Sequence, residues 1–187
     1  MKKALIPVLA IAMIALPIFL AAKPFGKTGT VGMQFLKLGV DARAIGMGEA
    51  YTAVSDDISS TYWNPAGLAP AYQNQAFISH TNWPANIMQE YAAGTFTNGV
   101  STVALYGSVL HMDKMDVTDE DTFAPTGETF TNSSIAMGAC YAQQFTNKFS
   151  AGVGVKYLRE NLYTYEVNSY AIRSEERRVG KECRSRW

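Results

Sequence analysis

The feature that most restricts the fold of this chain is a period-two alternation of side chains, which recurs from Phe77 onward. In Phe149–Leu158 the odd positions carry Phe, Ala, Val, Val and Tyr, while the even positions carry Ser, Gly, Gly, Lys and Leu. Successive residues of a strand point to opposite faces of a sheet, so this pattern gives one apolar face and one small or polar face. A strand with lipid on one side and a lumen on the other needs two such faces.

Six strands are predicted from this alternation: Gln75–Asn82, Met88–Phe96, Ser101–Leu110, Ser134–Phe145, Phe149–Leu158 and a last strand that starts within Ser169–Ile172. The connections Thr97–Gly99 and Thr146–Lys148 are short, whereas His111–Asn132 and Asn161–Glu166 are longer and polar. Bacterial outer-membrane barrels have short periplasmic turns and long outer loops. We therefore expect a mainly β fold, a partial antiparallel transmembrane β-barrel forming an open curved sheet of about six strands. A soluble β-sandwich is the alternative, because it alternates too.

Aromatic residues near the strand ends are consistent with a barrel that spans a membrane. Barrels carry girdles of aromatic side chains at both membrane interfaces. We expect such a girdle from Trp83, Tyr106, Tyr141 and Tyr157.

The N-terminus has the pattern of a secretory signal peptide. Lys2 and Lys3 precede an apolar run, Ala4–Leu20, and the small residues Ala21 and Ala22 follow it. A positive start, an apolar centre and a small-residue exit are typical of a cleaved signal. We expect residues 1–22 to be removed, with a retained membrane anchor as the alternative. Export together with a barrel places the protein in the outer membrane of a diderm bacterium.

The C-terminal run Arg173–Trp187 differs in composition from the rest. It holds six basic residues, whereas residues 23–172 hold eight basic and 13 acidic ones. The run resembles the translation of a sequencing-library adapter, so we expect residues 173–187 to be non-native and unpacked. A solvated basic tail is the alternative. The acidic remainder offers no electrostatic footprint for nucleic acid, which excludes that class of partner.

Between signal and strands, residues 23–74 do not alternate. Asp41 is expected to cap a short helix over Ala42–Met47, and Asp57 another over Ile58–Tyr62. Pro65 forces Asn64 out of the helical region and can begin a last helical turn. We expect a compact segment of short helices, rich in Gly and Ala so that backbones can approach closely.

Two motifs in this segment carry a resemblance to a known family. The first is Asp41-Ala-Arg43-Ala-x-Gly46-Met-Gly48-Glu-Ala, and the second is Trp63-Asn64-Pro65-Ala-Gly-Leu-Ala, with Asp56 and Asp57 between them. Together, at this spacing behind a signal peptide, they resemble the start of the PorV/PorQ family of outer-membrane barrels, which are similar to FadL-type transporters. The resemblance is strong over residues 29–71 and looser over the strands.

Membership of that family implies a barrel whose N-terminal segment plugs the lumen. It also implies a non-enzymatic link to type IX secretion, with outer-membrane lipid and secreted cargo or secretion-system components as partners. A FadL-like channel for hydrophobic small molecules is the alternative. The motif residues are expected to be structural: Arg43 pairs with Asp41, Asp56 or Asp57, and Trp63 or Leu68 covers apolar residues of the lumen.

Catalytic, cofactor and metal sites are not expected. His80 and His111 stand alone, and no nucleophile–base motif or phosphate loop is present. Gly46-x-Gly48 lacks the third glycine of a dinucleotide fingerprint. The acidic loop from Asp113 to Asp121 lacks the alternating ligands of a calcium loop and is read as solvated. Cys140 is read as a small buried apolar residue.

Overall fold

In the computed structural model, residues 31–70, 73–119, 121, 124–163 and 165–179 are described. The chain divides into two units, residues 1–32 and 33–187, and the description below concerns the second. The predicted signal peptide, residues 1–22, lies outside the described residues.

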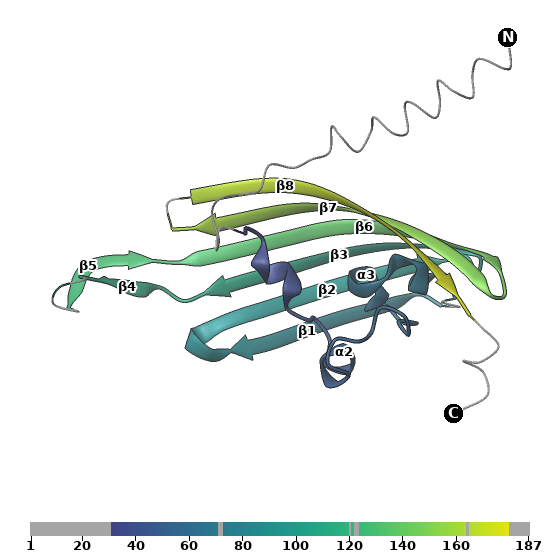
Figure 1. Ribbon diagram of the computed structural model, residues 1–187, viewed down its shortest axis with the longest axis horizontal. Helices are drawn as coiled ribbons and strands as arrows, with labels where there is room; N and C mark the ends of the chain where they lie inside the picture. The colour runs from purple at the N-terminus through teal and green to yellow at the C-terminus, as the bar shows by residue number, and fades with distance from the viewer. Residues whose placement is uncertain (1–30, 71–72, 120, 122–123, 164, 180–187) are drawn as a thin grey trace, which may run out of the picture. The chain divides into compact units, whose positions relative to one another are not determined.

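Six strands form one antiparallel sheet in the order β1-β2-β3-β6-β7-β8 (Figure 1). Their bounds are Gln75–Trp83, Ile87–Thr97, Ser101–Met112, Asn132–Thr146, Phe149–Leu162 and Tyr165–Arg178. β1 and β8 each have a partner on one side only, so the sheet is open. Since the smallest closed membrane barrels have eight strands, this sheet is a partial β-barrel, as the alternation predicted.

The strands agree with the sequence prediction more closely than the connections do. A separate hairpin, β4 (Met115–Thr118) and β5 (Pro125–Phe130), occupies much of the loop expected over His111–Asn132. The loop expected over Asn161–Glu166 is wrong in length, because β7 and β8 stay paired up to Leu162 and Tyr165. Main-chain pairing across a hairpin can continue through polar residues, since it uses backbone groups alone.

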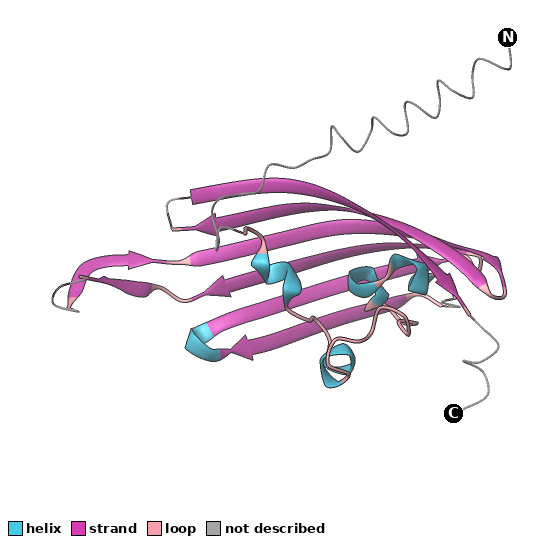
Figure 2. Cartoon of the chain, viewed as in Figure 1, coloured by secondary structure: helices cyan, strands magenta, loops and turns pink. Residues whose placement is uncertain are grey.

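The two faces of the sheet differ as the alternation predicted. On β7, Val153 and Val155 are about half exposed, whereas Ser150, Gly152 and Leu158 are buried on the opposite face. Lys156 shares the face of Gly152 and is half-buried. We call the face that bears Gly152 the plug face and the other the outer face; short helices cover the plug face (Figure 2).

Consecutive registers of the outer face are apolar from edge to edge. One register aligns Ile172, Val155, Ala139, Leu105, Gly94 and Ala76. The next aligns Tyr170, Tyr157, Met137, Gly107, Ala92 and Ile78, and the register beyond it brings in Arg159, Glu90 and His80. An apolar band bordered by charged residues is the pattern of a lipid-facing barrel surface.

The predicted aromatic girdle is wrong for two of its four residues and stays a prediction for the other two. Tyr141 and Tyr157 lie on the outer face, but Tyr106 and Trp83 lie on the plug face. Tyr106 stacks near Tyr91 with ring centroids 6.0 Å apart, and Trp83 Nε1 donates to Gln89 Oε1 over 3.1 Å. The strict period of two decides the face of a strand residue, and aromatic character does not override it.

Four short helices precede the sheet: η1 (Gln34–Lys37), α2 (Ala42–Gly46), α3 (Ser60–Trp63) and η2 (Pro65–Leu68). We call residues 33–69 the plug. A further 3₁₀ turn, η3 (Pro84–Asn86), joins β1 to β2. None of the helices in the described part of the chain is long and apolar enough to cross a membrane.

The expectation of an unpacked segment from Arg173 onward is wrong as far as Arg178. These residues continue β8 in register with β7, Arg173 opposite Gly154 and Arg178 opposite Phe149. Arg173 also donates from Nη1 to the carbonyl of Tyr62 over 3.2 Å. Extension of an edge strand needs backbone groups that any sequence supplies, so this pairing leaves the proposed adapter origin of residues 173–187 a prediction. Residues 180–187 lie outside the described part.

Candidate functional site

Asp41 joins α2 to α3 within the plug. Its Oδ1 accepts the backbone N–H of Ala44 over 2.8 Å, which caps α2 as predicted. Its Oδ2 accepts the indole N–H of Trp63 over 3.0 Å. Asp41 is buried, so each carboxylate oxygen has a donor where water is excluded. One side chain thus sets the start of α2 and fixes the end of α3 against it.

Arg43 forms ion pairs with Asp56 and Asp57, two of the three aspartates that the sequence offered as partners. Its Nη1 lies 2.8 Å from Asp56 Oδ1 and 3.2 Å from Asp57 Oδ2. The same nitrogen donates to the Tyr51 hydroxyl over 2.9 Å, and the guanidinium lies over the Tyr51 ring. The hydrogen bond to Asp56 raises the pKa of Arg43. This cluster is half exposed, so the individual ion pairs contribute little alone.

Asp57 has more partners than its neighbour. Its Oδ1 accepts both the backbone N–H and the hydroxyl of Ser59, and its Oδ2 accepts the Tyr51 hydroxyl over 3.0 Å. Burial acts to raise the pKa of Asp57, but hydrogen bonds from Ser59, Tyr51 and Arg43 outweigh it, so the pKa lies below its usual value. The helix predicted over Ile58–Tyr62 is wrong at its start: Asp57 accepts the Ser59 N–H in a turn, and α3 runs from Ser60 to Trp63.

Asn64 and Pro65 form the turn that carries η2. Asn64 is extended, with φ −160° and ψ 101°, as its place before proline predicts. Its side-chain oxygen accepts the N–H of Ala66 over 3.0 Å, and its amide donates to the Thr52 carbonyl over 2.9 Å. Gly67 follows where a Cβ would lie 2.4 Å from the Ser55 carbonyl oxygen. This close approach makes glycine the residue that fits.

The two glycines of the first motif have different roles. Gly48 has φ +63°, the left-handed region that glycine enters without strain. Gly46 has an ordinary helical backbone, and a Cβ there would meet nothing within 4 Å. Backbone conformation therefore explains the glycine at position 48. Packing among the described residues does not explain the glycine at position 46.

The backbone of the plug packs against β7 of the six-stranded sheet, which we call the wall. A Cβ on Gly152 would lie 2.5 Å from Pro65 C and 2.5 Å from Ala66 N. Two residues earlier on the same face, Ser150 donates from Oγ to the Ala66 carbonyl over 3.0 Å. Sequence reasoning missed this contact, although the small residues on the even positions of β7 were its signal.

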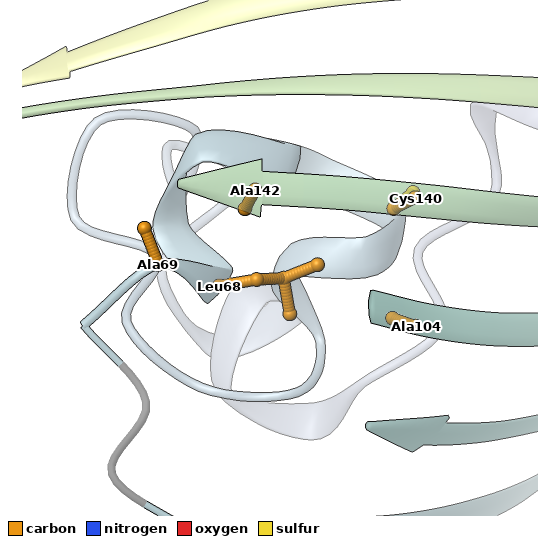
Figure 3. Packing of buried hydrophobic residues seen from close by; sticks show 5 residues of the cluster. All are labelled: Leu68, Ala69, Ala104, Cys140 and Ala142. Atoms are coloured by element: carbon orange, nitrogen blue, oxygen red, sulfur yellow. The ribbon is translucent and has the colours of Figure 1, made fainter. Parts of the chain in front are cut away.

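An apolar cluster continues the contact onto β3 and β6. Leu68 and Ala69 of the plug pack with Ala104, Cys140 and Ala142 of the wall (Figure 3). Leu68 is almost fully buried and points between β3 and β6, as expected of a residue covering the lumen. Cys140 is buried in this cluster, as the sequence predicted.

Neutral hydrogen bonds and two further apolar clusters add to the attachment. The Thr61 and Tyr91 hydroxyls are hydrogen-bonded to each other across the interface. Phe35 of η1 packs on Ala136 and Leu158. Near it, the backbone N–H of Met33 donates to Oε2 of Glu160, a carboxylate of the wall, over 2.7 Å.

In the described part of the molecule, little space remains where α3 and η2 meet the wall. A cavity of about 10 Å³ is lined by side chains of both, including Thr61, Tyr106, Cys140 and Lys156. A volume near this size holds at most one water molecule. No group of three or more His, Cys, Asp or Glu side chains in the described ranges is arranged to hold a metal ion.

The two histidines lie on strands of the sheet. His80 Nδ1 lies 3.7 Å from Glu90 Oε1 at the outer face, and both side chains are about half exposed. His111 is on β3. Within the described residues, the motif side chains contact one another and backbone groups, and a structural role for Arg43 stays a prediction.

Comparison with known proteins assigns the chain to a family. A search of curated proteins gave no match. The family model described as type IX secretion system protein PorV matches residues 23–179, which include the plug and the six strands of the sheet. Because that match extends over most of the chain, the protein belongs to the PorV family of type IX secretion system proteins.

Proposed function

We propose that this protein is a non-enzymatic outer-membrane barrel that serves type IX secretion by binding secreted cargo proteins or other components of the secretion system. The observation that carries the proposal is the difference between the two faces of the sheet. The outer face offers an apolar band bordered by charged residues, and the plug face is occupied by a folded segment. A wall of this kind suits a membrane protein whose working surfaces are its loops and rim.

Export supports this role. The family match begins at residue 23, immediately after the cleavage expected at Ala22. A cleaved signal would deliver the chain to the periplasm, from which the alternating strands insert into the outer membrane.

A FadL-like channel is the second candidate, since a plug can open. Against it stands the cavity where α3 and η2 meet the wall, which is about 10 Å³ and admits no hydrophobic compound there without displacement of these helices. The cavity has Lys156 in its lining, a group that an apolar ligand would have to pass.

A gene deletion in the host separates the two candidates. Cells lacking the protein are expected to retain type IX cargo in the periplasm, while uptake of a labelled long-chain fatty acid stays normal. Plasmid-borne wild-type protein should restore secretion. Normal secretion combined with lost fatty-acid uptake would reject the proposal in favour of the channel.

A further inference from the structure

A hollow of about 720 Å³ opens on the outer face of the sheet, across β3, β6, β7 and β8. Its outer-face lining belongs to two neighbouring registers, one running from Leu105 to Ile172 and the other from Gly107 to Tyr170. The other lining residues, such as Gly138, alternate with these and belong to the plug face, so their backbone borders the hollow. Apolar hollows of several hundred Å³ are typical of sites that bind small molecules.

Unequal side chains on β3 and β6 shape this hollow. In the first register Leu105 stands opposite Ala139, and in the second Gly107 stands opposite Met137. Leu105 and Met137 are each more than half exposed. A Cβ on Gly107 would meet only the carbonyl oxygen of Ala136 within 4 Å, at the limit of that range. The hollow is therefore space that a ligand from outside the wall can fill.

Polar groups lie at one end of the hollow. The Tyr157 hydroxyl donates to Asn168 Oδ1 over 2.7 Å, and Arg159 is the register partner of Asn168. Arg159 follows Tyr157 on the same face by two residues, ~7 Å along the strand. Its Nη2 donates to Glu166 Oε2 over 2.8 Å, and half of the side chain is exposed. Because a guanidinium has five N–H donors, Arg159 can bind a further anion. An apolar hollow that ends at a cation matches an acyl chain that ends at a phosphate.

We propose that this hollow binds one phospholipid molecule, with an acyl chain between the two registers and the phosphate against Arg159. One arginine at the end of one hollow fits a lipid with a single phosphate. The inference rests on the proposed place in the outer membrane and not on the secretion role. It goes beyond the contact that any apolar band makes with lipid, because one position on the wall retains its lipid.

Lipid retention by the purified protein tests the site. Protein expressed from its complete gene is incubated in mixed micelles of dodecyl maltoside and phosphatidylglycerol, and native mass spectrometry measures the fraction that carries one lipid. Gly107→Leu fills the hollow, so the dissociation constant is expected to rise about tenfold or more as the acyl chain loses apolar contact.

Gly94→Leu is the matched control. Gly94 lies on the outer face in the register of Leu105 and outside the lining of the hollow, and a Cβ there would meet nothing within 4 Å. Lipid binding by this variant should equal that of the parent protein. Equal binding by Gly94→Leu and Gly107→Leu would overturn the proposal, and so would a parent protein that carries a second copy of the chain in place of lipid.

A second comparison tests the phosphate. The parent protein is expected to prefer phosphatidylglycerol to a diacylglycerol with the same acyl chains, and Arg159→Gln should lose this preference while still binding the neutral lipid. A parent protein without the preference, or one that retains lipid A from its membrane instead of a phospholipid, overturns the site alone. Protein that stays dispersed without detergent would overturn the membrane placement on which the site rests, and the two failures are thereby distinguished.

Discussion

The interior of the plug and its interface with the wall are stabilised differently. Inside the plug, charged side chains hold the fold together. Arg43 pairs with Asp56 and Asp57, and the carboxylates of Asp41 and Asp57 accept hydrogen bonds from backbone and side-chain groups of the plug. Between plug and wall, the described contacts are mostly neutral: backbone against Gly152, a serine hydroxyl, and apolar side chains. Glu160 and Arg173 are exceptions, and each binds a backbone group of the plug: Glu160 the N–H of Met33, and Arg173 the carbonyl of Tyr62.

This difference has a physical reason. A charge between plug and wall would be desolvated on docking and would need a partner on the other surface. Charges within the plug keep their partners whether or not it is docked. Folding of the plug and docking of the plug are therefore separable, and variants should affect one without the other. The predictions below use protein expressed from its complete gene.

The largest effect is expected at the closest contact of the interface. Gly152→Ala places a Cβ 2.5 Å from plug backbone, and overpacking of this kind costs about 1–3 kcal/mol. Gly154→Ala is the matched control on the same strand and face, where the added Cβ meets the Cys140 sulfur at 3.0 Å. Urea unfolding in detergent should show a clear loss for the first and a smaller one for the second. Equal losses would mean that the plug does not dock as described.

Inside the plug, the two neighbouring aspartates should differ. Asp57→Asn weakens hydrogen bonds from Ser59 and Tyr51, and bonds to a charged group contribute about 1.5–3 kcal/mol. Asp56→Asn removes an exposed ion pair, for which about 0–1 kcal/mol is usual. Proteolysis of the plug by trypsin, followed over time, measures its opening. Greater sensitivity of Asp56→Asn would contradict the division of roles.

Ser150→Ala tests the polar contribution of the wall. The variant removes the shorter of two hydrogen bonds to the buried carbonyl of Ala66, which also accepts the Ala69 N–H over 3.4 Å, and the loss costs about 1 kcal/mol. Because Ser150 belongs to the interface, the loss should appear in docking and leave the capping contacts of Asp41 and Asp57 intact. Hydrogen exchange at Ala44 and Ser59, whose N–H groups those aspartates accept, reads this out. Faster exchange there would show that plug folding depends on docking.

The smallest effect expected is a response to pH. The pKa of Asp57 is lower in the folded plug than in an unfolded chain, where it is about 4. Its stabilisation is therefore present above that unfolded value and is lost as the pH falls through the folded one. Trypsin-type digestion is unsuitable in acid, so pepsin sensitivity from pH 5 to pH 2 is the measurement. Asp57→Asn should flatten the profile, whereas Gly152→Ala should shift it without changing its shape.

The strands could be predicted because their information is local. Alternation in Phe149–Leu158 gave the face of every residue on β7, including Gly152 and Lys156. The helix cap at Asp41 and the extended Asn64 followed from the same kind of short-range rule. The β4–β5 hairpin and the length of the β7–β8 turn were missed, since backbone pairing there depends on how neighbouring strands are held.

Which residues of the plug meet the wall was beyond the sequence. No feature of the neighbouring sequence distinguishes Gly152, which packs against the plug backbone, from Gly154, which faces Cys140. Likewise Asp56 and Asp57 are adjacent and identical, yet only the fold brings Tyr51 and Ser59 to the second.

The sequence by itself determined the period of the strands, the face of each strand residue, the capped turns of the plug and the family resemblance, because all of these depend on residues close together in the chain. The tertiary structure decided the open order of the sheet, the docking of Pro65 and Ala66 on Gly152, and the choice of Asp57 over Asp56 as the better bonded carboxylate. Those contacts join residues far apart in the sequence, or depend on which way a turn presents a side chain, and packing in three dimensions settles both.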